Sequence, residues 1–282
     1  MEVFNNKVLF GDDNDSSYKN WLEIISENKS VEKLVYPSLK FLSNTTLLIL
    51  HNSNINGSPN FSHYIKTFEI SDKTYSIGKV LTHNNTEEEE NINIPDFNSL
   101  EYFIIGKNFS FKERGFIFTG SFSSNFVEFK VSDQNTKIKS LGKYIVSVDE
   151  KILYSFYPST SNVDLSHLTE CTKFIEAIFC SNYILNSIVL PPNLETILDK
   201  CFIYCTNLNK IELPQKLKYV GKEVFSYSAL NEIFIPKSVD FIGKNCFYST
   251  NNPTFYTNIG NKEKLKGLLI NSGVSKPNII ER

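Results

Sequence analysis

The side chains best suited to redox or metal chemistry are five cysteines and four histidines, in a chain of 282 residues. The cysteines form no C-x-x-C pair, and His51, His63, His83 and His167 follow no metal-ligand spacing. The sequence contains no G-x-S-x-G, Walker or H-E-x-x-H motif. It therefore predicts no enzyme activity, no cofactor and no metal site.

Three of the cysteines hold fixed places in the repeat that is described below. Cys201 and Cys246 each precede a Phe and lie two repeat units apart. In a stacked fold this separation is about 10 Å, which is too far for a disulfide. Cys205 comes three residues after Phe202, where the following units have Ser or Thr. We interpret these cysteines as small buried fillers; a disulfide elsewhere and a metal site are the alternatives.

An acidic cluster, Asp12 to Ser16 with Glu23 further on, shares some features with an EF-hand calcium loop. The glycine expected at the sixth place is Ser17, and no helix is expected before the cluster. The same acids would also cap a helix that begins near Ser17. Calcium binding and helix capping are thus two readings of one stretch.

Composition and charge limit the possible partners. Hydrophobic residues make up 41% of the chain and charged residues 21%, as in ordinary folded proteins. The net charge of −2 implies no general attraction to nucleic acid. The N-terminus has no signal-peptide pattern, and the apolar run Leu47 to Leu50 is far shorter than a membrane span, which needs about 20 residues. We expect no nucleic-acid partner and no membrane span.

The chain is organised around three consecutive copies of one unit between Leu185 and Asn252. Each copy opens L-x-x-I-x-[LI]-P and closes on a Phe, namely Phe202, Phe225 and Phe247, at spacings of 23 and 22 residues. A period of roughly 20–29 residues with apolar residues in fixed phase is typical of leucine-rich repeats. The sequence therefore predicts a β-rich solenoid with short parallel strands.

Weaker copies extend the repeat through most of the chain. They open at Ile65, Leu100, Phe126 and Val163. The polar run His83 to Asn93 is expected to be an insertion or turn, and residues 132–158 a hairpin excursion with strands at Tyr144 to Val148 and Ile152 to Phe156. We predict a helical N-terminal cap over residues 1–45, a solenoid over 46–258 and a helical C-terminal cap over 259–282, with a helix from Lys262 to Asn271 capped by Gly273.

These motifs resemble the BspA-like leucine-rich repeats of the Treponema pallidum type. The resemblance rests on the L-x-x-I-x-L-P openings, the I/V-G-x-x-x-F steps and the intervening break. The residues that carry it are Leu185, Leu208, Leu230, Val220 to Phe225, Ile242 to Phe247, Val131 to Asn135 and Lys151 to Pro158. The resemblance implies a curved right-handed solenoid used for adhesion or protein binding, as on many bacterial and protozoan cell surfaces.

The opening motif also predicts which strand residues face outward. Its first, fourth and sixth residues fill the core, so the third and fifth lie on the concave face. A Gly such as Gly221 permits a tight bend or a positive φ. We expect roughly eight to ten turns. Apolar residues on such a face can anchor a partner, although strands favour them in any case. The candidate ligand-binding residues are Tyr102, Ile104, Val189, Lys210, Glu212, Glu232 and Phe234.

The sequence thus favours a non-enzymatic binding module that recognises a protein or cell-surface ligand on its concave strand face or edge. The alternative is an intracellular leucine-rich repeat scaffold with no surface role. We expect a monomer. The sequence leaves the location open between the cell surface, which the resemblance suggests, and the cytoplasm.

Overall fold

The computed structural model describes residues 100–111, 115–118 and 125–282. Before residue 100 it describes only the residues that belong to strands. The chain divides into two compact units, Met1–Val148 and Asp149–Arg282. These units meet between Val148 and Asp149, whereas the predicted domain boundaries lie near residues 45 and 258. The predicted boundaries therefore stay predictions. The architecture is a β-solenoid of about seven turns, fewer than the expected eight to ten.

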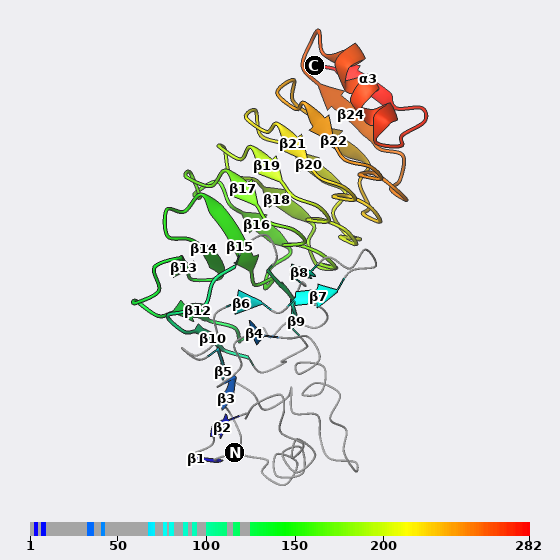
Figure 1. Cartoon of the computed structure of the whole chain (residues 1–282). Coiled ribbons are helices and arrows are strands. Elements are labelled where there is room, and N and C mark those ends of the chain that lie inside the picture. Colours follow the sequence, from blue (N-terminus) through cyan, green and yellow to red (C-terminus); the bar gives the residue numbers. More distant parts are fainter. Residues whose placement is uncertain are drawn as a thin grey trace, which may run out of the picture. The chain divides into compact units, whose positions relative to one another are not determined.

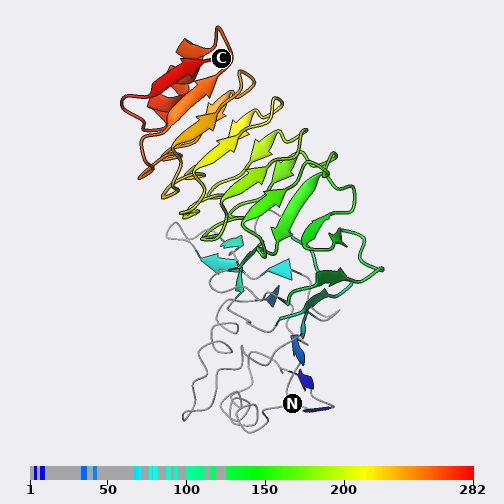
Figure 2. The same cartoon turned by 180° about the vertical axis from the view of Figure 1, so that it is seen from behind.

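The C-terminal unit contains one strand for each L-x-x-I-x-L opening, and we call these the opening strands. β16 (Asn162–Asp164) pairs in parallel with β18 (Ser187–Val189). A second parallel set follows in the order β20 (Lys210–Glu212), β22 (Glu232–Phe234), β24 (Thr254–Thr257) and β25 (Asn278–Glu281). Figures 1 and 2 show these strands as successive rungs of one stack.

A second strand in each turn forms another parallel ladder. Its order is β15 (Ile152–Phe156), β17 (Lys173–Phe174), β19 (Thr196–Ile197), β21 (Tyr219–Val220) and β23 (Phe241–Ile242). The register aligns equivalent residues of each turn, so that Phe174 faces Ile197 and Ile197 faces Val220. The two ladders enclose the core between them, as the repeat predicts.

The Phe that closes each unit fills the centre of the stack. The ring of Phe202 lies 4.9 Å from Phe179 and 5.5 Å from Phe225, and Phe225 lies 5.6 Å from Phe247, all in stacked geometry. Each of these rings is buried. One unit alone would leave its Phe bare on both sides, so neighbouring turns must stack to bury it.

The repeat glycines serve close packing, and the expectation of a positive φ at this place is wrong. Positive φ angles are found instead at non-glycine residues, among them Lys200 and Glu223. A Cβ added at Gly243 would lie 2.5 Å from the carbonyl carbon of Gly221, and one at Gly221 would overlap Asp199. Only a residue without a side chain allows the turns to approach so closely.

The C-terminal cap contains the predicted helix and one strand that the sequence did not reveal. Helix α3 (Lys262–Asn271) has the predicted bounds, and Gly273 follows it with φ 104°, as a C-cap glycine should. No strand was predicted after this helix, but β25 pairs in parallel with β24. The strand extends the opening ladder by one more rung.

The N-terminal unit repeats the parallel pattern, except at its first strand, which is antiparallel to the second. A six-stranded sheet runs in the order β1 (Val3–Phe4), β2 (Lys7–Leu9), β3 (Lys33–Tyr36), β5 (Thr67–Ile70), β10 (Tyr102–Ile105) and β12 (Glu128–Val131). Phe68, Phe103 and Phe129 align in its register and are buried. The repeat predicted for this half is thus confirmed from β5 onward.

The structure bears on two expectations for the first hundred residues. The run His83 to Asn93 contains β8 (Glu87–Glu89), which is antiparallel to β7 (Lys79–Leu81). It also contains the first residues of β9 (Ile92–Ile94), which pairs in parallel with β11 (Phe116–Phe118). Leu34 and Val35 fall within the predicted helical N-terminal cap, but they lie in β3, so the cap is not helical there. The rest of the predicted N-terminal helix and the acidic cluster lie outside the described residues. β4 (Phe41–Leu42) pairs with β6 (Ser76–Ile77).

The excursion predicted over residues 132–158 contains the two expected strands and one further strand before them. β14 (Tyr144–Ser147) and β15 are the two predicted strands, and the sheet order runs β13 (Ile138–Leu141), β14, β15, β17. β13, which was not expected, forms a hairpin with β14, and β15 pairs in parallel with β17. Asn135 precedes the hairpin and ties it to the turn after β10. Its amide donates to the carbonyls of Gly106 and Phe109, and its carbonyl oxygen accepts from the N–H groups of residues 137 and 138.

Candidate binding groove on the opening strands

The outward strand positions of the C-terminal unit are those that the sequence predicts. On β18, β20 and β22 the central Ile is buried, whereas its neighbours on the strand are exposed or half-buried. Val189 stands out because 54% of it is exposed, a high fraction for an apolar side chain. The register places Lys210 beside Glu232 and Glu212 beside Phe234.

A groove of about 760 Å³ lies where the opening ladder is divided, between β18 and β20. Four of the seven predicted binding residues line it. They are Val189 from β18, Lys210 and Glu212 from β20, and Phe234 from β22. Together they combine two apolar side chains with a cation and a carboxylate, and Arg282 adds a second cation, a composition that is suited to a polypeptide ligand.

The remaining predicted residues do not line this groove. Glu232 is half-buried beside Lys210. Tyr102 and Ile104 belong to β10 in the N-terminal unit and are half-buried. There the ammonium of Lys130 lies 3.9 Å from the centre of the Tyr102 ring and 3.8 Å from the Glu128 carboxylate. Tyr102 is therefore partly covered by its own neighbour.

Arg282 is the groove residue that the sequence did not reveal. Its guanidinium donates to Glu212 Oε1 over 3.4 Å and lies 4.3 Å from the Tyr256 ring and 5.5 Å from the Phe234 ring. Both charged side chains are largely exposed, so the ion pair itself contributes little to stability. Its position could not be predicted because β25, the strand that brings it there, was not expected.

Four of the five cysteines are buried in the core, and Cys180 is half-buried. All five are free thiols, and Cys201 and Cys205 are fully buried, where each donates to a backbone carbonyl of the preceding turn. Burial raises the pKa of the Cys171 thiol to about 11 and that of Cys246 to about 12. These thiols stay protonated and inaccessible at neutral pH, as the interpretation of small buried fillers requires.

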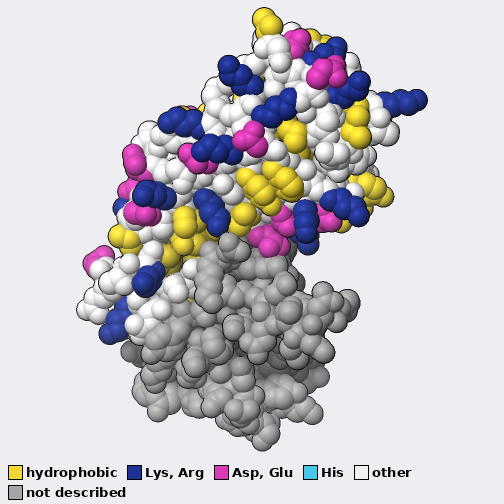
Figure 3. All heavy atoms as spheres, turned by 45° about the horizontal axis from the view of Figure 1, so that its top comes forward, with side chains coloured by type: hydrophobic (Ala, Val, Ile, Leu, Met, Phe, Trp, Pro, Cys, Tyr) yellow, Lys and Arg dark blue, Asp and Glu magenta, His cyan; other side chains and the backbone are white. Residues whose placement is uncertain are grey.

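Among the described residues, no group of His, Cys, Asp and Glu side chains is arranged to hold a metal ion. On the face that Figure 3 shows, basic and acidic side chains are interspersed among apolar ones. In the part of the chain that the structure describes, no helix is both long and apolar enough to span a membrane.

The parallel ladders, the Phe stack and the L-x-x-I-x-L strands define a solenoid of the leucine-rich repeat class. Residues 123–254 match the profile of the BspA type leucine rich repeat region, in six copies. This stretch of the chain is a BspA-type leucine-rich repeat region.

Comparison with solved structures gives distant matches. A leucine-rich repeat protein from Eubacterium ventriosum is 13% identical, with a TM-score of 0.39, over 89% of this chain and 71% of that one. The pneumococcal vaccine antigen PcpA is 15% identical, with a TM-score of 0.35, over 89% and 79%. A leucine-rich cell surface protein from Faecalibacterium prausnitzii is 10% identical, with a TM-score of 0.27, over 84% and 90%. No curated protein matches the sequence.

Proposed function

We propose that the chain is a non-enzymatic binding module that recognises a protein ligand in the groove between β18 and β20. The observation that carries the proposal is the exposure of Val189 in a groove that Phe234 also lines and that presents Lys210, Glu212 and Arg282. An exposed apolar centre with charged residues around it is the usual composition of a binding surface. The BspA-type repeat region supports the same class of function.

A double substitution tests the groove. Val189→Glu with Phe234→Glu places two carboxylates on the apolar centre, beside Glu212, and should abolish binding while the protein stays folded. The matched control is Tyr183→Glu with Ile259→Glu, which changes two exposed apolar residues outside the groove. Partners captured by the unmodified chain would be purified, and their Kd for each variant measured by calorimetry. Unchanged affinity in the groove variant would refute this site.

The cell surface is the location that we propose for this activity, by analogy with other BspA-like proteins. Labelling of intact cells with a membrane-impermeant reagent tests it, because a surface-exposed chain reacts before the cells are broken. Detection only after lysis would refute a surface role.

An intracellular scaffold with the same fold is the second candidate. The observation in its favour is the set of five free cysteines, none of which is in a disulfide. Unpaired thiols are ordinary in reducing compartments and less so outside the cell. The labelling experiment separates the two candidates, since only the scaffold would escape labelling in intact cells.

A further inference from the structure

A ladder of backbone hydrogen bonds joins the loops that carry the closing Phe residues, and we call it the loop ladder. In each turn three N–H groups, two residues apart, donate to carbonyls of the next turn. The N–H groups of Lys200, Phe202 and Tyr204 donate over 2.9–3.0 Å to the carbonyls of residues 222, 224 and 226. Those of Glu223, Phe225 and Tyr227 donate over 2.9–3.1 Å to residues 244, 246 and 248.

The last turn satisfies one of its three donors. The N–H of Asn245 donates over 2.8 Å to the carbonyl of Ser272, in the segment after α3. The N–H groups of Phe247 and Ser249 have no acceptor among the described residues. The cap thus continues the opening ladder through β25, but it leaves two of the three loop-ladder donors of the last turn without an acceptor among the described residues.

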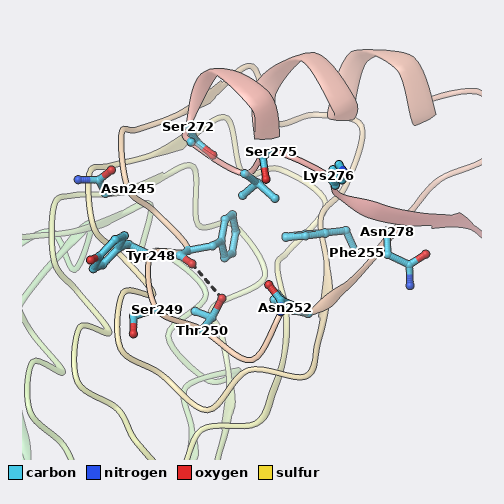
Figure 4. Close-up of a pocket in the computed structure, with 14 residues that line it drawn as sticks. Asn245, Tyr248, Ser249, Thr250, Asn252, Phe255, Ser272, Ser275, Lys276 and Asn278 are labelled. Atoms are coloured by element: carbon cyan, nitrogen blue, oxygen red, sulfur yellow. Dashed lines mark hydrogen bonds between the residues drawn. The ribbon is translucent and has the colours of Figure 1, made fainter.

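A pocket of about 450 Å³ lies at this open edge. Figure 4 shows it between the last turn, which carries Tyr248, Ser249 and Thr250, and the segment after α3, which carries Ser272, Ser275 and Lys276. The rings of Phe247 and Phe255 pack edge to face, 5.0 Å apart, and form its apolar side. Both rings are themselves buried, so they close this side of the pocket with little aromatic surface exposed.

The pocket also adjoins a second unpaired edge. Asn278 lines it and belongs to β25, which is the last strand of its sheet, with β24 on one side and no strand on the other among the described residues. Unpaired strand edges and unpaired N–H groups are sites where an added polypeptide segment can bind through its backbone.

From this arrangement we infer that the pocket binds an extended segment of a partner protein, which continues the loop ladder. Two carbonyls of the segment, two residues apart, accept from the N–H groups of Phe247 and Ser249. The chemistry is that of a polypeptide, because in both preceding turns the same pair of donors is satisfied by carbonyls with this spacing.

The probe is a nine-residue peptide that copies residues 244–252, with Ser in place of Cys246, since this loop satisfies the same donors one turn earlier. It would be titrated to millimolar concentration into the full chain labelled with ¹⁵N at Phe and Ser. We expect the amide signals of Phe247 and Ser249 to shift and their hydrogen exchange to slow by about tenfold or more. A scrambled peptide should have no effect.

Two variants test whether the peptide acts in the pocket. Ser275→Trp adds a ring over the pocket from an exposed position and should abolish the response to the peptide, while Ser166→Trp, also exposed but outside the pocket, should leave it intact. Peptide binding that survives Ser275→Trp in the folded protein would overturn the assignment, as would unchanged amides in the unmodified chain.

Other occupants give different results, and each would overturn the inference. If acetate alone protects the two amides to the same extent, the site recognises a carboxylate rather than a polypeptide backbone. If the amides become protected without peptide as the protein concentration rises, and sedimentation shows a dimer, the occupant is a second copy of this chain.

Discussion

At the scale of single residues, stability depends on groups that repeat from turn to turn. Phe225 is fully buried between the stacked rings of Phe202 and Phe247. Its place was predictable, because the spacing of 23 and 22 residues sets the phase of the closing Phe. A gap in this stack would remove contacts on both sides of the missing ring.

Phe225→Ala should therefore lower the free energy of unfolding by about 3–5 kcal/mol. The loss combines the transfer of a buried ring with a cavity that the two neighbouring turns cannot close. Urea titration followed by circular dichroism measures it. Tyr183→Ala, at an exposed residue, is the control and should cost little. If the urea titration curve were unchanged by Phe225→Ala, this residue would not be the closing Phe of its unit, and the assigned phase of the repeat would be contradicted.

Two buried asparagines give a second test, because their surroundings differ. The side chain of Asn135 makes four hydrogen bonds, two as donor and two as acceptor. That of Asn182 is equally buried, but its oxygen and nitrogen have no partner among the described residues. Burying a polar group without a partner costs free energy, whereas a satisfied one stabilises the fold.

Asn135→Ala should destabilise the protein by about 2–3 kcal/mol, because it leaves the carbonyls of Gly106 and Phe109 unsatisfied. Asn182→Ala should change stability by less than about 1 kcal/mol, since no hydrogen bond is lost. Thermal unfolding of both variants, compared with the unmodified chain, provides the measurement. Equal losses would mean that the side chain of Asn182 has a partner in the folded protein.

At the scale of elements, the sequence predicted the strands that carry the repeat motif, and it missed the C-terminal strand that does not carry it. The L-x-x-I-x-L openings identified β18, β20 and β22 and the direction of their side chains, because alternation along a strand is a local property. β25 was missed because N-I-I-E has no Phe, Pro or Gly in the repeat phase. It is a strand because β24 offers it an edge. Arg282 and the open loop ladder depend on that strand and cap, so they could not be predicted either.

The repeat glycines provide a test at this scale. Gly243→Ala should destabilise by about 1–3 kcal/mol or more, because the added Cβ would lie 2.5 Å from the backbone of the preceding turn. Gly267→Ala is the matched control. Gly267 lies within α3, and a Cβ there meets nothing within 4 Å, so this variant should gain up to about 1 kcal/mol from helix propensity. If both variants melt alike, close packing is not the role of Gly243.

At the scale of the whole molecule, the reactivity of the cysteine thiols in the C-terminal unit can be used to follow unfolding. Its five buried or half-buried cysteines are spread from Cys171 to Cys246. Because each turn contacts only its neighbours, the stack could open one turn at a time or all at once. The rate at which each thiol becomes reactive distinguishes the two cases.

We expect the unit to unfold as one body, so that Cys201, Cys205 and Cys246 react with a maleimide at the same urea concentration. Peptide mapping after a short labelling pulse identifies the reacted thiols. Separate transitions along the stack would contradict cooperative unfolding.

The burial of the cysteine thiols also predicts how the stability of the protein depends on pH. Burial raises the pKa of Cys171 to about 11 in the folded protein, from about 9 in the unfolded chain. The folded state thus favours the protonated thiol, and this contribution to stability is complete below pH 9 and is lost progressively from pH 9 to about 11. Cys171→Ala should reduce the fall in melting temperature over this range. An equal fall in both proteins would exclude a contribution from this thiol.

The close approach of Gly243 to Gly221 also limits how such a gene can change in length. An insertion of a few residues inside a turn would move a residue with a side chain into a place that admits none. A whole unit of 22 or 23 residues, by contrast, adds its own glycine in phase. Natural alleles should therefore differ in this region by complete turns, and short in-frame insertions between Asp199 and Gly243 should be rare among them.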